Sequence, residues 1–392
     1  RPDPNDFASL ITRALHGHGV TDPVTYHPKE FKLSIGNESA HFFYLHNAYR
    51  DYLNAPRRRR REVVDCYLRM LAQSSMEIPR SLDDAIDHIL PMVRSRAYFE
   101  LNKLQSQTEG LEGWIVPYRT LADNIAIGLG YDRTDAISLL STKDFDAWKI
   151  SFDELFQKAQ DNLWETTTNQ FHSPQPGVYV SPYGDSHDAA RLLFWELIVQ
   201  NEVKGTPVIA VPDRHTLIIT GSDDLAGLEY LVAAGEKALE EIRLVSTQPL
   251  ILDNQRWTEL RLPDDHPLYD RFRMCEIQER MSNYNEQQTL LERLYENRGE
   301  DVFVGTFSAT KHRKSGFMSS FCVWVNGVES DLPRTDRIVF MQDEKECLGW
   351  GDWPEAFTAF GHLMKKNLEY PERYRVESFP SKEQLAQIRL KN

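Results

Sequence analysis

The apolar residues of this chain fall in short runs, and their spacing changes repeatedly along the sequence. In 7–15 they recur at the three- and four-residue intervals of an amphipathic helix, whereas 31–35 alternates with the period of a half-buried strand. Further on, 207–212 and 215–221 are apolar as buried strands are, and a helical pattern follows at 225–242. The sequence therefore predicts an α+β fold of helices and small, mainly antiparallel sheets.

The length of 392 residues predicts two or three folding units. A capping box at Ser151 and Glu154 begins a new helix, and a polar, proline-containing linker covers 246–266. We expect a mixed α+β domain at 1–150, a strand–helix–strand–strand–helix domain at 151–245, and a helix, antiparallel hairpin and helix at 246–392. Similar turns at 211–215 and 332–336 suggest a weak internal duplication of the last two units.

Local patterns predict several further elements. Gly36-Asn37 interrupts a two-stranded element at 30–45, and Pro56 separates two helices within 47–72. Asn326-Gly327 is a hairpin-turn signal between two strands. Further helices are expected at 82–92, 188–200, 268–295 and 354–368, and strands at 177–181, 302–308, 317–325 and 338–342.

Composition restricts the function classes. A net charge of −14 and a pI near 5.4 disfavour nucleic-acid binding. The sequence has no apolar run long enough to predict a membrane span, no secretory signal at its first residues, and four widely spaced cysteines, so we expect a cytoplasmic protein with free thiols. No motif predicts a metal or cofactor, and the oligomeric state is left open.

The middle of the chain resembles a bacterial family without an assigned reaction, the YtpQ-like proteins. The resemblance is carried by the segments 152–163, 177–180, 189–193 and 210–221, with weaker likeness at 47–52 and 89–94. It covers about residues 5–245 and leaves the last third as an extension. The resemblance implies a bacterial cytoplasmic protein and transfers no catalytic residue.

The first candidate site is the turn Asp213-Arg214-His215, which places a carboxylate, a guanidinium and an imidazole together. Asp185, His187 and Asp188 on an earlier loop would complete an acid–base or metal site if both loops met at one end of the sheet. The alternative is structural: Asp213 forms the turn through its own backbone, and the charged neighbours pair on the surface.

Two basic segments are candidate contacts for an acidic partner or an anionic ligand. Lys311, His312, Arg313 and Lys314 form a basic hairpin tip, although charged strand ends also prevent edge pairing. The five arginines 57–61 offer bidentate contacts to oxyanions. Helical geometry spreads them around the cylinder, which favours a solvated helix start.

Trp324, Trp350 and Trp353 either line a binding pocket or close a small core, and the core interpretation is favoured. Since no catalytic motif is complete, we expect a non-catalytic binding or protein-interaction module. The alternative is an enzyme that acts on an anionic small molecule or polymer through Asp213, Arg214 and His215.

Overall fold

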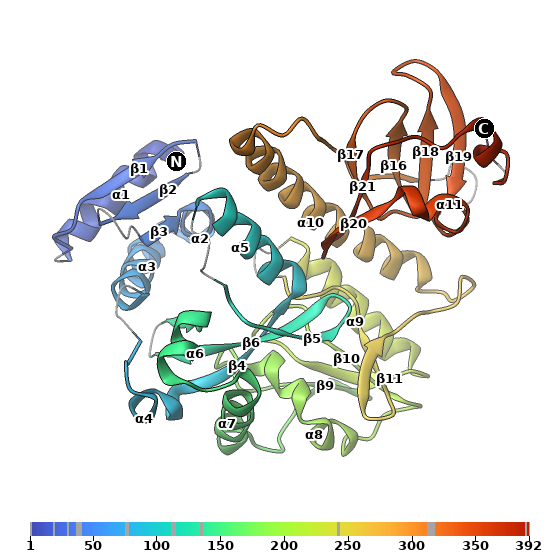
Figure 1. Ribbon diagram of the computed structural model, residues 1–392. Helices are drawn as coiled ribbons and strands as arrows, with labels where there is room; N and C mark the ends of the chain where they lie inside the picture. Colours follow the sequence, from blue (N-terminus) through green and yellow to red (C-terminus); the bar gives the residue numbers. More distant parts are fainter. Residues whose placement is uncertain are drawn as a thin grey trace. The chain divides into compact units, whose positions relative to one another are not determined.

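The computed structural model divides into two compact units, which are described separately (Figure 1). Unit 1 comprises Arg1–Leu90, Leu129–Leu140 and Asp144–Asn162. Unit 2 comprises Pro91–Gly128, Ser141–Lys143 and Leu163–Asn392. The predicted boundaries near 150 and 245 stay a prediction. The residues that the structure describes are 2–18, 20–29, 31–36, 41–74, 78–110, 115–133, 136–240, 244–311, 318–388 and 390–391.

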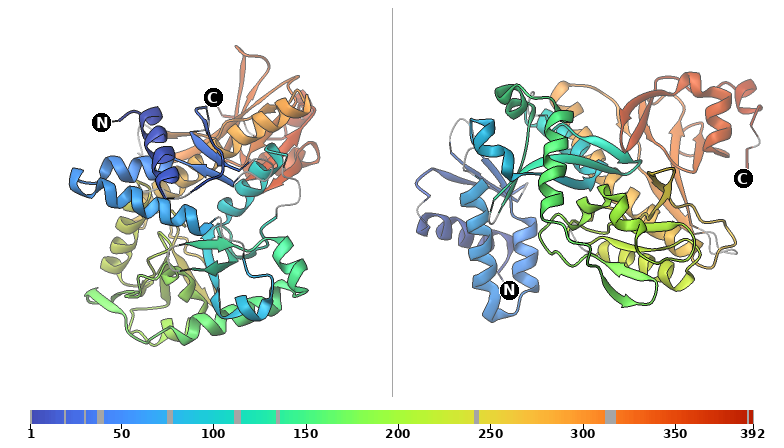
Figure 2. Two further views of the ribbon diagram at one scale, coloured as in Figure 1. Left: turned by 90° about the vertical axis from the view of Figure 1, so that its left-hand side faces the viewer. Right: turned by 90° about the horizontal axis from the view of Figure 1, so that it is seen from below.

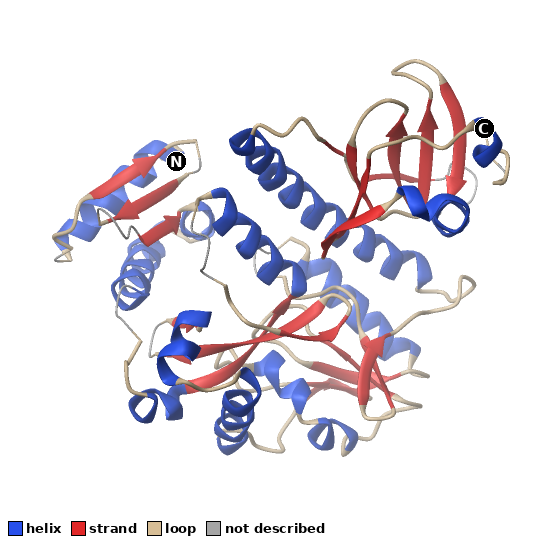
Figure 3. Ribbon diagram, in the orientation of Figure 1, coloured by secondary structure: helices blue, strands red, loops and turns tan. Residues whose placement is uncertain are grey.

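The predicted α+β class is confirmed. The described residues contain five sheets of three to six strands, interspersed with helices along the chain, and most of the strand pairs are antiparallel (Figure 3). The parallel pairs that are described, β14–β17 and β16–β18, both belong to the C-terminal part of unit 2.

Unit 1 begins with an amphipathic helix over a small sheet. Asp3 caps α1 and forms a capping box with Asp6, and the apolar face of α1 packs through Phe7 and Ile11. The predicted two-stranded element is a three-stranded sheet of order β1-β2-β3, because the additional strand β1 pairs with β2. The bounds are α1 (Pro4–Gly17), β1 (Val24–His27), β2 (Lys32–Ile35), β3 (His41–Tyr44), α2 (His46–Asn54), η1 (Arg57–Arg59) and α3 (Arg60–Ser74).

The break at Pro56 is confirmed, since α2 ends before it and α3 begins after it. Most of the arginine run is exposed, as a solvated helix start requires. Arg60 lies over the Tyr52 ring at 5.0 Å, and Arg61 approaches Asp65 at 4.0 Å.

The helix predicted at 82–92 is wrong beyond residue 88. The chain forms α4 (Leu82–Ala85) and η2 (Ile86–His88), and then strand β4 (Ile89–Ser95). Pro91 explains the change, because proline breaks a helix interior but is tolerated in an edge strand, and β4 lies at the edge of the sheet β4-β6-β5. Also in this part of the chain are α5 (Arg96–Thr108), β5 (Arg119–Ala122), β6 (Ile125–Asp132), β7 (Ile137–Leu139), α6 (Thr142–Trp148) and α7 (Phe152–Glu165).

The N-terminus of α7 confirms the predicted capping box. Ser151 Oγ accepts from the Glu154 backbone at 3.3 Å, and Glu154 Oε2 accepts from the Ser151 backbone at 3.1 Å. These reciprocal bonds satisfy donors that a helix start otherwise leaves unpaired.

Unit 2 contains a six-stranded sheet of order β13-β12-β10-β11-β9-β8, in which the predicted strands β10 and β11 pair antiparallel. The helix predicted at 188–200 is instead a 3₁₀ helix followed by a short α-helix, and the predicted helix at 225–242 is α9. The bounds are β8 (His172–Gln175), β9 (Val178–Val180), η3 (Asp188–Leu193), α8 (Trp195–Val199), β10 (Pro207–Ala210), β11 (Ile218–Gly221), α9 (Leu225–Ala238), β12 (Leu250–Asp253) and β13 (Arg256–Glu259).

The long helix α10 (Tyr269–Arg298) contacts α5, α9, β14, β15 and β16, and Figures 1 and 2 show it beside α5. Two four-stranded sheets follow, of order β14-β17-β21-β20 and β15-β16-β18-β19. The bounds are β14 (Phe303–Val304), β15 (Ser308–Lys311), β16 (Met318–Val325), β17 (Ser330–Pro333), β18 (Arg337–Met341), β19 (Cys347–Asp352), α11 (Trp353–Phe360), η4 (Gly361–Leu363), β20 (Lys365–Glu369), β21 (Glu372–Val376) and α12 (Lys382–Leu385).

Three expectations for this region are wrong. The turn at Asn326-Gly327 leads from β16 into a different sheet, so β16 and β17 are not a hairpin. The helix predicted at 354–368 ends at Phe360, and the polar residues after Met364 form β20 against β21. The strand predicted at 302–308 is divided between β14 and the start of β15.

The segments predicted to be duplicated do not share a strand pairing. The turn at 211–215 lies between β10 and β11, which pair with each other. The similar turn at 332–336 joins β17 to β18, which belong to different sheets.

Aromatic and cysteine side chains mainly close the cores. Trp324 and Trp353 are buried in the C-terminal cluster, which favours the core interpretation for Trp324, whereas Trp353 also lines the cleft described below. All four cysteines are free thiols, of which Cys275 and Cys322 are buried. Burial raises the pKa of each of these two thiols to about 12, so both are protonated and unreactive at neutral pH.

The two glycines within α9 give opposite predictions. A Cβ on Gly227 would lie 1.8 Å from Thr220 Oγ1 on β11, whereas one on Gly235 would meet nothing closer than 3.4 Å. We expect Gly227→Ala to destabilise the protein by about 1–3 kcal/mol through overpacking. Gly235→Ala should be neutral, or stabilising by up to about 1 kcal/mol through helix propensity. Urea unfolding of both variants measures the difference, and equal free energies of unfolding would contradict this packing.

Candidate functional site

The two loops of the predicted Asp/Arg/His site do meet. The backbone N–H of Ala189 donates to the carbonyl oxygen of Arg214 at 3.3 Å. The Asp213 carboxylate serves its own turn, because Oδ1 accepts from the His215 backbone at 2.7 Å and Oδ2 accepts from the Thr216 hydroxyl at 3.2 Å. This is the structural alternative expected for Asp213.

A buried arginine anchors the loop that carries Asp185, His187 and Asp188. Arg191 is fully buried and donates to both oxygens of Asp185, at 3.0 and 2.7 Å. Burial alone would raise the pKa of Asp185, but the bonds from Arg191 outweigh it and the pKa is lowered. His187 Nδ1 lies 3.1 Å from the carbonyl oxygen of Pro91. Asp188 Oδ1 accepts from the Tyr183 backbone at 3.1 Å.

A functional role for these six residues stays a prediction, and none of them lines the cleft described below. The basic hairpin tip is described only in part. Lys311 is exposed at the end of β15, which pairs with β16 as predicted. His312, Arg313 and Lys314 lie outside the described residues.

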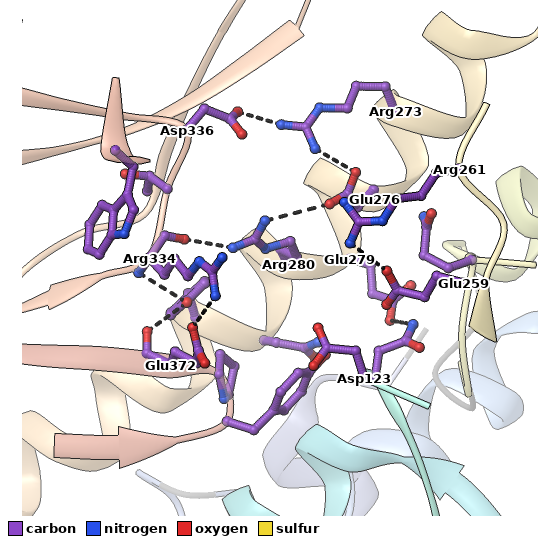
Figure 4. Close-up of a pocket in the computed structure, with 18 of the residues that line it drawn as sticks. Asp123, Glu259, Arg261, Arg273, Glu276, Glu279, Arg280, Arg334, Asp336 and Glu372 are labelled. Atoms are coloured by element: carbon purple, nitrogen blue, oxygen red, sulfur yellow. Dashed lines mark hydrogen bonds and ion pairs between the residues drawn. The ribbon is translucent and has the colours of Figure 1, made fainter. Parts of the chain in front are cut away.

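A cleft lies within unit 2, along one face of α10 (Figure 4). Its volume is about 700 Å³, which is in the range of small-molecule sites. Charged side chains dominate its walls. The lining residues are Asp123, Asn124, Gln248, Glu259, Arg261, Arg273, Glu276, Glu279, Arg280, Asn283, Tyr284, Arg334, Thr335, Asp336, Trp353, Pro354, Tyr370, Pro371 and Glu372.

Helix α10 supplies the largest set of these side chains. Arg273, Glu276, Arg280 and Asn283 recur every three or four residues, which places them on one face of the helix. The remaining walls come from several other elements. They are the β5–β6 turn at Asp123-Asn124, Gln248 before β12, the end of β13, the β17–β18 connection, the start of α11, and the β20–β21 turn with the first residue of β21.

Ion pairs fix the arginines of the cleft. Arg273 bridges Glu276 and Asp336, and Asp336 also accepts from the Ser320 backbone and hydroxyl at 2.7 and 2.8 Å. The positive charge of Arg273 and these donors lower the pKa of Asp336, although burial opposes them. Arg280 lies 3.6 Å from Glu276.

The opposite side of the cleft has a second anchored pair. Arg334 Nη1 donates to Glu372 Oε2 at 2.7 Å, and Figure 4 shows this pair across the cleft from Glu259. Tyr284 connects the same two segments, because its hydroxyl donates to the carbonyl oxygen of Glu372 at 2.8 Å and accepts from the Arg334 backbone at 3.2 Å. The arginine side of the cleft is therefore held in place by α10 itself.

Glu279 is the most deeply buried carboxylate of the cleft, with 3% of its surface exposed. Its Oε2 accepts from the Thr247 backbone and hydroxyl, both at 2.7 Å, and Asn124 Nδ2 lies 3.4 Å from Oε1. Burial raises the pKa of Glu279 despite these donors. The folded protein thus favours the protonated carboxyl more than the unfolded chain does.

The pKa of Glu259 is raised as well. Burial is the main cause of its raised pKa, and the negative charges of Asp123 and Glu276 add to it. Arg261 opposes the shift through a contact of 3.1 Å, but its side chain is 85% exposed and solvent screens the pair. Two carboxyls with raised pKa values in one cleft can hold or release protons near a bound molecule.

Sequence analysis missed this cleft, although part of its signal was visible. The sequence predicts the helix at 268–295, but the arginine and glutamate positions at 273, 276 and 280 match no motif that would indicate a site. The residues from other elements range from Asp123 to Glu372 along the sequence, and only the fold brings them to α10.

In the part of the chain that the structure describes, no group of three or more His, Cys, Asp or Glu side chains is arranged to hold a metal ion. Among the same residues, no helix is both long and apolar enough to cross a membrane.

Comparison with known proteins yields no matching family model, no matching curated protein and no matching solved structure. The resemblance to the YtpQ-like proteins therefore stays a prediction from the residues quoted for it.

Two substitutions of Glu279 separate the effect of its protonation on stability from the effect of its hydrogen bonds. Glu279→Gln keeps an acceptor for Thr247 and imitates the protonated carboxyl at every pH. Glu279→Ala leaves the Thr247 donors buried without a partner, which should cost about 1–3 kcal/mol.

The raised pKa gives this comparison a pH dependence. The stability that the protonated Glu279 contributes is full below the unfolded pKa of about 4.3, and it is lost as pH rises through the folded value. Relative to wild type, Glu279→Gln should therefore gain stability between pH 4 and pH 8. Urea unfolding at both pH values measures the gain, and a Glu279→Gln variant as unstable as Glu279→Ala at pH 8 would contradict it.

Proposed function

We propose that this protein is a non-catalytic binding protein that takes a small polar ligand in the cleft on α10. The observation that carries the proposal is a cleft of about 700 Å³ whose charged walls are already ordered by ion pairs. Groups that are held in position before a ligand arrives lose little conformational entropy on binding it. A purely structural ion-pair network would have no need of an open volume of this size.

The alternative of an enzyme that uses Asp213, Arg214 and His215 has weaker support. The contact between Ala189 and Arg214 favours it, because it brings the two candidate loops together. The hydrogen bonds of Asp213 to its own turn oppose it, since both carboxylate oxygens are already engaged. A protein-interaction role for the segment at Lys311 is a further possibility within the same binding class.

A cytoplasmic location and kinship with the YtpQ-like proteins belong to this proposal as well. The free thiols of all four cysteines support the location, because an oxidising compartment favours disulfides. The segments quoted between 5 and 245 support the kinship.

The cleft proposal can be tested by blocking the cleft with a bulky side chain. Asn283 lines it from α10, whereas Asn285 is exposed on the same helix and does not line it. We expect Asn283→Trp to fill the cleft and Asn285→Trp to serve as the matched control.

Thermal unfolding would be recorded with a panel of amino acids, polyamines, dicarboxylates, sugar phosphates and nucleotides. A ligand at 100 times its Kd stabilises the folded state by about 2.7 kcal/mol, which corresponds to a rise in Tm of several degrees. At least one panel member should raise the Tm of wild type and Asn285→Trp but not that of Asn283→Trp. No shift in wild type, or equal shifts in all three proteins, would contradict the proposal.

A further inference from the structure

The cleft carries more negative than positive charge. Six carboxylates line it, against four arginines. Four of these carboxylates form what we call the acidic wall: Asp123, Glu259, Glu276 and Glu279. Figure 4 shows Asp123, Glu259 and Glu279 on the side of the cleft away from Arg334.

The members of the acidic wall are close enough to repel one another. The charges of Asp123 and Glu276 both act on Glu259, and that of Glu276 acts on Glu279. Like charges are held together in a fold at a cost, and a cation between them removes that cost.

Three of the four arginines of the cleft offer little to an anion, whereas the fourth, Arg261, is 85% exposed and contacts Glu259 at 3.1 Å. Arg273 contacts two carboxylates and Arg334 one, and Arg280 donates to the carbonyl oxygen of Arg334 at 2.7 Å. An anionic ligand would have to break these contacts and would meet the acidic wall as well. Electrostatic complementarity therefore disfavours an anion.

Glu279 has no cation among its hydrogen-bond partners in the described chain. Its donors are Thr247 and Asn124, which are neutral, and its side chain is almost completely buried. Asp123, another member of the acidic wall, lies 4.0 Å from Arg96, and its side chain is 74% exposed.

Asn124 provides an independent observation. It lines the cleft and is 95% buried, being 5% exposed, and its Oδ1 accepts no hydrogen bond from the residues described. The orientation of the amide is set by its nitrogen, which donates to Ser246 Oγ at 2.6 Å and faces Glu279. A buried carbonyl oxygen without a donor is costly, and a protonated amine or a guanidinium carries only donors.

We propose that the cleft on α10 takes a small organic cation, whose amine or guanidinium group lies against the acidic wall beside Asn124. This inference rests on the proposed binding function and narrows its ligand class. The ordered arginines at the other side leave room for one further polar group, such as the second amine of a diamine or a hydroxyl.

Isothermal titration with agmatine and cadaverine tests the ligand class on the full chain, with citrate as the anionic probe. Glu259→Gln removes one charge from the acidic wall, and it should fold because burial makes the charged carboxylate costly at this position. Glu296→Gln is the matched control, because it removes the same charge from an exposed position near the end of α10.

We expect at least one of the two cations to bind wild type and Glu296→Gln alike, about tenfold or more weakly to Glu259→Gln, and not to Asn283→Trp. Cation binding that is insensitive to Glu259→Gln would overturn the inference, as would the absence of binding by both cations. Citrate binding that Asn283→Trp abolishes would contradict the proposed cationic ligand class, but it would still support a ligand-binding cleft. If no panel compound, including citrate, binds in a manner that Asn283→Trp blocks, the proposed function fails together with the inference.

Discussion

The C-terminal half of unit 2 depends on one buried guanidinium. Arg373 on β21 is fully buried and donates to Gln287 Oε1 on α10 and to the carbonyl oxygen of Gly305, both at 2.6 Å. It also reaches the carbonyl oxygens of Asp331 and Tyr284, at 2.9 and 3.4 Å. One charge thus connects the long helix to two strands and the segment before β15. Burial lowers the pKa of Arg373 to about 10, so it remains charged at neutral pH.

This connection positions the cleft. Glu372, the first residue of β21, lines the cleft directly before Arg373, and Tyr284 on α10 donates to its carbonyl oxygen. A buried charge whose acceptors would be left unpaired is expensive to displace, so helix and turn keep a fixed separation. The open volume between them is therefore a property of the fold and not of loose packing, and the ion pairs along its rim are ordered by the same anchors.

The sequence predicts some of this architecture well and some poorly, for physical reasons. The β10–β11 pair and the Ser151 capping box follow from local patterns, and both are confirmed. The helix predicted at 354–368 includes 365–368, which belong to β20 instead, because their pairing with β21 decides the outcome. Asn326-Gly327 is a turn, but which sheet receives the next strand depends on tertiary packing. Local sequence patterns do not predict the acidic wall at all, because Asp123, Glu259 and Glu279 become neighbours only after folding.

A crystal structure of the full chain grown with agmatine tests the central claim most directly. The account predicts electron density for the cation in the cleft on α10, within hydrogen-bond distance of the acidic wall and with a nitrogen facing Asn124 Oδ1. Density at another surface with an empty cleft, or a cleft closed by the side chains of α10, would contradict it.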